Sequence, residues 1–163
     1  MENERTPIKR SKQLAPLSRE HHDGLLFGWK IKQGISNNTP TFKLRKFTMW
    51  FWQQYIKQHF FKEEKILLPY LPAGDEMVVR LKTEHDDIRE LILGLDDEAD
   101  KQTLIILCDF LEKHIRFEER EFFPHIEKML TTQQLNEIFE ELEKVPHAYT
   151  EEWDDDEFWV TKK

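Results

Sequence analysis

Cysteine, glycine and proline are scarce in this sequence, with 1, 5 and 7 of each among 163 residues. The single cysteine, Cys108, excludes an internal disulfide framework and fits a reducing compartment. Because turn residues are few, long segments remain between them, and apolar residues recur in these segments at steps of three and four. The sequence therefore predicts an all-α protein, long enough for one domain with a sizeable core.

Long apolar runs and an excess of positive charge are also missing. No apolar stretch approaches the length of a membrane span, and no apolar run follows the charged first residues as in a secretory signal. The formal net charge of −8 opposes contact with the phosphate backbone of nucleic acids. We therefore expect a cytoplasmic protein that binds neither membranes nor nucleic acid.

Turn residues divide the chain into four long helical segments. Helices are expected from about Ser18, a candidate cap, to residue 34, from 41 to near Pro69, between the turns at 72–75 and 94–97, and from about Glu98 to Pro124. Thr131 could cap a further helix. The prediction is a flexible segment over residues 1–16, an antiparallel up-down four-helix bundle over 17–130, and a short C-terminal helix with an acidic aromatic tail over 131–163.

The tail, residues 151–159, combines acidic residues with aromatic ones. One interpretation is a segment docked onto the bundle through Trp153 and Trp159, since terminal segments are otherwise mobile. The other is a motif that binds a protein partner. We favour the docked tail.

The second and fourth predicted helices end in one repeated pattern. Starting at His59 and at His114, both read His-x-x-x-Glu-Glu, then a basic residue, one variable position, two bulky apolar residues and a proline ten residues after the histidine. Residues four apart lie on the same face of a helix. The imidazole of His59 and the carboxylate of Glu63 should therefore point together, as should those of His114 and Glu118.

The second glutamate of each pattern, Glu64 or Glu119, lies about 100° further round its helix. We expect both on the solvated face and leave them out of the site. His125 and His147 have no counterpart in the repeat, and we assign them no role.

The first and third helices each offer one more histidine. His85 lies on the apolar stripe of the third helix and should face inward. On the first helix, giving Leu25 the role of Ile88 selects His22, whereas matching the glutamate before each histidine selects His21. We prefer His22 and keep His21 as the alternative.

These side chains form a candidate metal site drawn from four helices. Burying four imidazoles and two carboxylates without a cation would leave a large desolvation cost. Two metal ions bridged by the glutamates could each take two imidazoles and keep positions for a small ligand, and such a ligand set favours iron or manganese over tetrahedral zinc. The predicted ligands are His22, His59, Glu63, His85, His114 and Glu118.

With these motifs the chain resembles the hemerythrin-like family, especially its His-His-Glu cation-binding branch, over about residues 17–130. The resemblance implies two iron ions bridged by the two glutamates and an oxo or hydroxo group. Oxygen-carrying hemerythrins have a second histidine where this chain has Arg89, and an aspartate where it has Glu118. These departures argue against simple oxygen carriage.

The implied function is binding or sensing of oxygen, nitric oxide, peroxide or iron without enzymatic turnover. Two alternatives stay open. One is an enzyme that reduces peroxide, nitric oxide or oxygen at the metal pair. The other is a regulatory module in which metal binding sets the stability of the bundle and the tail contacts a partner.

Overall fold

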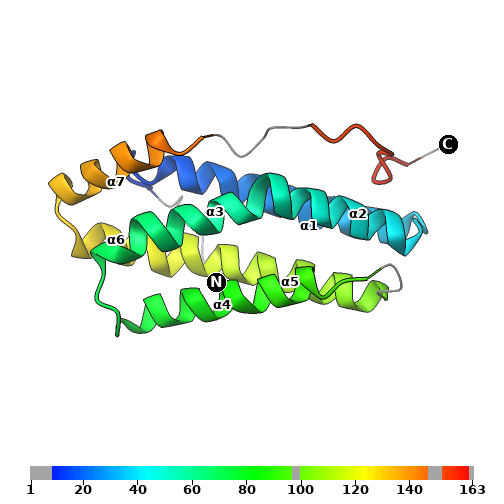
Figure 1. Ribbon diagram of the computed structural model, residues 1–163, viewed down its shortest axis with the longest axis horizontal. Helices are drawn as coiled ribbons and strands as arrows, with labels where there is room; N and C mark the ends of the chain where they lie inside the picture. The colour runs from blue at the N-terminus through cyan, green and yellow to red at the C-terminus, as the bar shows by residue number, and fades with distance from the viewer. Residues whose placement is uncertain (1–8, 97–99, 147–151, 162–163) are drawn as a thin grey trace, which may run out of the picture.

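The computed structural model describes residues 9–96, 100–146 and 152–161, and across them it is all-helical. Four antiparallel rods lie side by side, and a short helix, α7, follows them at one end of the bundle (Figure 1). The rods are α1 (Ala15–Ser36), α2 (Thr41–Phe51) with α3 (Lys57–Lys62), α4 (Glu76–Leu93), and α5 (Lys101–Phe117) with α6 (Phe123–Met129), and α7 spans Thr132–Lys144. This arrangement confirms the predicted four-helix bundle with an additional C-terminal helix.

The second and fourth rods contain wide π-helical turns, in which an N–H bonds the carbonyl five residues back. They are η1 (Trp52–Ile56), η2 (Glu63–Leu67) and η4 (Glu118–Phe122), and a 3₁₀ turn, η3 (Leu68–Tyr70), ends the second rod. In η2 and η4 the five-residue bond closes on the residue just before Pro69 or Pro124. Because proline lacks an N–H, it fits the first turn of the helix that follows. The fourth rod therefore continues past Pro124 as α6.

The starts of the helices follow the predicted caps only in part. Thr131 caps α7 as expected, and Asp75, at the end of the predicted turn, caps α4. α1 begins three residues before Ser18, whose hydroxyl instead donates to a carboxylate of the fourth rod. The expected start at Glu98 lies outside the described residues, and Asp100 caps α5.

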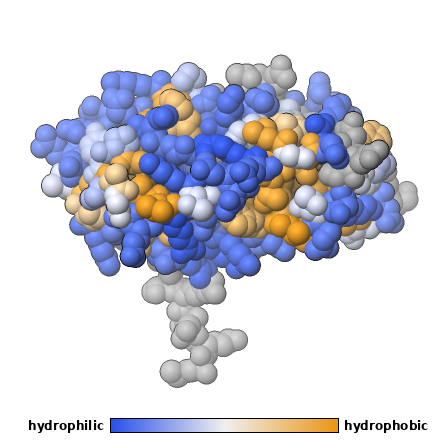
Figure 2. Space-filling view, turned by 60° about the horizontal axis from the view of Figure 1, so that its bottom comes forward, coloured by the Kyte–Doolittle hydropathy of each residue, from blue (hydrophilic) through white to orange (hydrophobic). Residues whose placement is uncertain are grey.

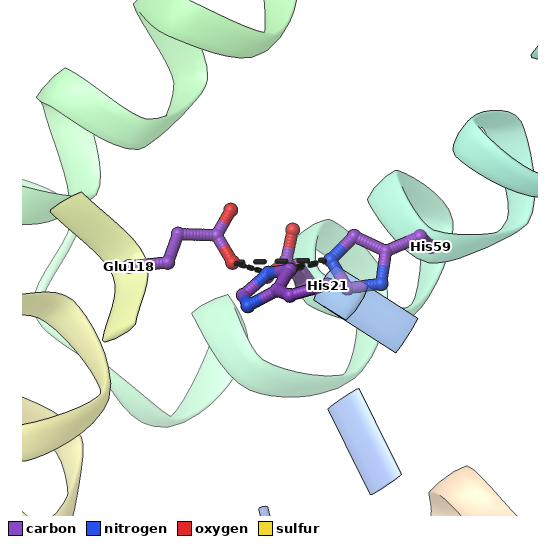
Figure 3. A group of neighbouring side chains, drawn as sticks. His21, His59 and Glu118 are labelled. Carbon is purple, nitrogen blue, oxygen red and sulfur yellow. Dashed lines mark hydrogen bonds and ion pairs between the residues drawn. The ribbon is translucent and has the colours of Figure 1, made fainter. Parts of the chain in front are cut away.

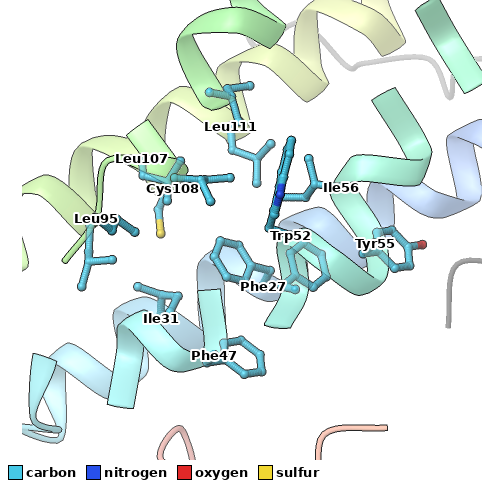
Figure 4. Close-up of a cluster of buried hydrophobic side chains, with 14 of the residues drawn as sticks. Phe27, Ile31, Phe47, Trp52, Tyr55, Ile56, Leu95, Leu107, Cys108 and Leu111 are labelled. Carbon is cyan, nitrogen blue, oxygen red and sulfur yellow. The ribbon is translucent and has the colours of Figure 1, made fainter. Parts of the chain in front are cut away.

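Two apolar clusters fill the bundle, one on each side of its middle. The first includes Phe27, Phe47, Trp52, Leu107 and Leu111 (Figure 4), and the second includes Leu17, Leu67, Leu81, Phe117 and Phe123. On α4, His85 lies between Leu81 of the second cluster and Ile88 of the first. The buried histidines therefore occupy a polar layer between two dry regions.

The tail packs on the bundle, which agrees with the docked interpretation. Phe158 is 3% exposed, and its ring meets that of Phe47 at a centroid distance of 5.2 Å. Gly34 provides the space, since a Cβ there would lie 2.5 Å from Cδ1 of Phe158. Trp153 and Trp159 pack against the same Phe47 ring. Burial of Phe158 alone is worth about 1.5–3 kcal/mol.

The surface is mostly hydrophilic, with apolar patches between the charged side chains (Figure 2). Among the described residues, every helix is too short or too polar to cross a membrane.

Candidate metal centre

Six buried side chains from all four rods meet in the polar layer, and each is at most 7% exposed. They form two groups of four, in which one ligand atom from each residue lies within 4.8 Å of the others. One group holds His21 and His59, the other holds His85 and His114, and Glu63 and Glu118 belong to both. The two carboxylates therefore stand between two pairs of imidazoles.

Glu118 faces both pairs with different oxygen atoms. Its Oε2 lies 2.8 Å from Nε2 of His21 and 3.8 Å from Nε2 of His59 (Figure 3). Its Oε1 lies 2.5 Å from Nε2 of His114 and 3.5 Å from Nε2 of His85. Each oxygen of Glu118 thus faces one of the two pairs of histidines.

Glu63 repeats this relation from the second rod. Its Oε2 lies 3.4 Å from Nε2 of His59, and its Oε1 lies 3.2 Å from Nε2 of His85. The two halves are related by an approximate two-fold axis that exchanges α1 with α4 and the second rod with the fourth. The repeated sequence pattern is the local expression of this symmetry.

The preference for His22 on the first helix is corrected by the structure. His21 is buried in the site, whereas His22 is exposed. The error came from pairing Leu25 with Ile88, because Leu25 is 43% exposed and Gly24 faces inward at the equivalent position. Because glycine has no side chain, Gly24 does not contribute to the apolar periodicity. The inward face of the first helix is therefore not visible in the pattern. The glutamate that precedes each histidine was the reliable signal.

Each of the four histidines is also held from behind by a second carboxylate. Nδ1–H donates to this carboxylate, which leaves Nε2 directed at the centre. The pairs are His21 with Glu119 at 2.9 Å, His59 with Glu20 at 2.8 Å, His85 with Glu64 at 2.6 Å and His114 with Glu84 at 2.7 Å. These four glutamates, which we call the outer carboxylates, fix the direction of every imidazole.

The expectation that Glu64 and Glu119 are merely solvated is therefore wrong. In a four-helix bundle every rod has two neighbours, so a side chain about 100° from the centre points into the groove beside the next rod. There Glu64 meets α4 and Glu119 meets α1. Helix periodicity placed both residues correctly on the helix but could not show what faced them.

Basic side chains accompany the outer carboxylates. The nearest pairs are Glu20 with Lys62 at 2.7 Å, Glu64 with Arg89 at 2.6 Å, Glu84 with Arg80 at 2.9 Å and Glu119 with Arg10 at 3.9 Å. Burial alone would raise the pKa of Glu20, but His59 and Lys62 lower it to about 2. A basic side chain thus neighbours each outer carboxylate, and Arg10 pairs more closely with Glu127, at 2.9 Å.

The carboxylates of Glu63 and Glu118 raise the pKa values of buried histidines. Burial opposes protonation of His21, yet attraction and hydrogen bonding by Glu118, with a further bond to Glu119, raise its pKa to about 9. Burial likewise opposes protonation of His85, while Glu118, Glu63 and Glu64 raise its pKa to about 10. The centre therefore attracts positive charge, which protons or a metal can supply.

Several buried atoms of the centre lie close to another ligand candidate but form no hydrogen bond of acceptable geometry. Within the described residues these atoms include both oxygens of Glu63, Oε1 of Glu118 and Nε2 of His85 and His114. Buried polar atoms without partners are costly. Since all of them converge, a set of imidazole nitrogens and carboxylate oxygens fits a bound transition-metal cation.

An apolar cavity adjoins the centre and is lined by His21, His59 and His114. Its walls include Phe51, Tyr55 and Ile115, and it offers about 20 Å³ to the centres of water-sized molecules. One water needs roughly 10–15 Å³ on this measure. The cavity therefore suits a molecule of one or two heavy atoms.

Comparison with known proteins identifies the family. The family model described as the hemerythrin HHE cation binding domain matches residues 19–126, which is more than half of the chain and includes all six buried ligand candidates. Neither the curated proteins nor the solved structures contain a match to the chain. The repeated His-Glu pattern, the bundle and the family match agree, and the chain belongs to the hemerythrin HHE cation-binding domain family.

Proposed function

We propose that this protein holds two iron ions in the polar layer and uses them to bind or sense a small ligand such as oxygen, nitric oxide or peroxide. The observation that carries the proposal is the sharing of Glu63 and Glu118 by two groups of histidines. His21 and His59 would hold one ion, His85 and His114 the other, and both glutamates would bridge them.

Different residues of the chain would have different roles around the two iron ions. Bound ferrous iron supplies electrons and open coordination positions. The outer carboxylates hold each Nδ1–H, so the Nε2 lone pairs stay aimed at the ions. The two apolar clusters keep bulk water from both ends of the site. The small cavity has room for a ligand of about two heavy atoms.

Arg89 supports a ligand set of four histidines. It stands where oxygen-carrying hemerythrins have a fifth histidine, and its guanidinium bonds Glu64 at 2.6 Å. A guanidinium stays protonated and offers no lone pair to a metal. Both halves would then hold two imidazoles each, which separates this chain from the carriers and favours sensing or another use of the bound ligand.

Metal analysis of protein purified from its own host tests the proposal. We expect two iron ions per chain, and a charge-transfer band when the anaerobic ferrous protein meets oxygen. Glu63→Ala and Glu118→Ala should each lose roughly both ions, because a bridge serves both. Glu141→Ala, which changes an exposed residue on α7, is the control.

If the alanine variants fold poorly, Glu118→Asp provides a second variant. It keeps the negative charge, but its side chain is one methylene group shorter. Retention of one full ion in both alanine variants, or native protein without transition metal, would overturn the proposal. Steady consumption of peroxide or nitric oxide with a reductant would instead assign an enzyme.

A further inference from the structure

A surface groove between α1 and α5 ends against the cavity of the metal centre. Leu25 and Trp29, which are 43% and 51% exposed, belong to its walls, and Cys108 lines it from α5. The groove offers about 320 Å³ to the centres of water-sized molecules. Gly24 lines both the groove and the inner cavity. The two spaces therefore meet at the backbone of Gly24.

Ile115 closes the passage at this point. A Cβ built on Gly24 would lie 2.8 Å from Cδ1 of Ile115, so the end of this side chain rests against bare backbone. Ile115 is buried and lines the inner cavity. A terminal methyl moves by a change of rotamer, which breaks no hydrogen bond. The side chain that separates groove from cavity at Gly24 is therefore a movable apolar group.

A second approach to the cavity is closed more firmly. Glu20 lines the cavity and also a charged surface pocket that contains Arg19 and Lys62. Its carboxylate bonds Lys62 at 2.7 Å and His59 at 2.8 Å. Opening this side would break charge-assisted bonds. An uncharged diatomic molecule would not interact strongly with the charged groups that this opening exposes.

We propose that the groove between α1 and α5 is the entrance for small uncharged ligands, with Gly24 and Ile115 as its gate. This inference rests on the proposed function, because the ligand's destination is the metal pair. The groove exposes more apolar than polar surface, although Lys32 and Glu112 also line it, and apolar surface concentrates uncharged molecules such as nitric oxide and oxygen. The glycine leaves room that a side chain would fill. The gate governs how fast a ligand arrives, while the metals govern how tightly it binds.

Stopped-flow binding of nitric oxide to the ferrous protein tests the gate. Gly24→Ala should slow association by about tenfold, which corresponds to a barrier of ~1.4 kcal/mol. The iron content should stay unchanged, because Gly24 belongs to neither group of ligand candidates. Ile115→Val, which lacks Cδ1, should speed association. Gly28→Ala is the matched control on the same helix, because its Cβ would meet Cys108 only at 3.9 Å in the wide part of the groove.

Two outcomes would overturn the gate. One is unchanged rates in Gly24→Ala with normal iron content. The other is acceleration in Lys62→Met, which would assign the entrance to the charged pocket. If the wild-type protein holds no iron pair or binds no nitric oxide, the proposed function fails instead.

Xenon pressure on crystals of zinc-loaded protein gives a readout that does not depend on iron. Xenon should occupy the groove beside Gly24. Xenon at the Lys62 pocket, with none in the groove, would contradict the inference.

Discussion

Glu20 precedes His21 in the sequence, yet its carboxylate holds the other histidine of that pair, His59, with 2.8 Å between Oε1 and Nδ1. The symmetry-related Glu84 holds His114 in the same way at 2.7 Å. Each imidazole is therefore fixed by a residue of a neighbouring rod. Metal affinity should depend on the packing of the rods as well as on the ligands.

Loss of an outer carboxylate should weaken metal binding without removing a ligand. Glu20→Ala frees the ring of His59, and we expect the metal affinity to fall about 10–100-fold. Glu20→Gln keeps an oxygen acceptor and should restore part of the loss. Competition with a chelator measures the affinity, and Glu140→Ala, on the exposed face of α7, is the control. Equal affinities in the Glu20 and Glu140 alanine variants would contradict the positioning role.

The adjacent histidines on α1 form a matched pair. His21→Ala should lose most of the bound metal, because it removes a nitrogen from the centre and one hydrogen-bond partner from each of Glu118 and Glu119. His22→Ala should keep full metal content, since His22 is exposed. The measurements are the number of iron ions per chain and, as a check on folding, the helix content by circular dichroism. Full loading of the His21 variant would remove it from the ligand set.

The metal-free protein should become less stable as the pH rises. The pKa of His21 is about 9 and that of His85 about 10 in the folded protein, above the ordinary value of 6.5. Protonation therefore favours folding, and this contribution is complete below pH 6.5 and lost as the pH rises through 9 to 10. Urea denaturation of chelated protein between pH 6 and 10 should show the midpoint falling.

Metal affinity should change in the opposite direction over the same range. Because bound metal needs neutral imidazoles, binding releases protons and strengthens as the pH rises toward 9 to 10. Proton release can be measured in weakly buffered titrations. A flat denaturation midpoint together with pH-independent metal affinity would show that the buried histidines are neutral before metal binds.

The tail should contribute measurably to the stability of the bundle. Phe158→Ala removes a ring from the first apolar cluster and should lower the free energy of unfolding by about 3–5 kcal/mol. It should also expose the tail to proteases. Val160→Ala, at a half-exposed neighbour, is the control and should change little. Protease resistance that differs between metal-free and loaded protein would link the tail to the centre, as the regulatory alternative requires.

Local helix geometry made much of the centre predictable. His59 with Glu63 and His114 with Glu118 could be assigned from sequence because residues four apart share a helix face whatever surrounds them. The turn residues likewise marked the rods, and the repeat indicated their symmetry. Each of these features can be recognised along one helix or one turn, without knowledge of how the helices pack.

The remaining features depended on how the rods face one another. The choice of His21 over His22, which stand about 100° apart on the helix, depended on Gly24 facing α5. The partners of Glu64 and Glu119 lie on other rods, so helix periodicity could not name them. Sequence alone thus determined which residues could bind metal, whereas tertiary packing decided which of them meet, because contacts between rods join residues far apart in the chain.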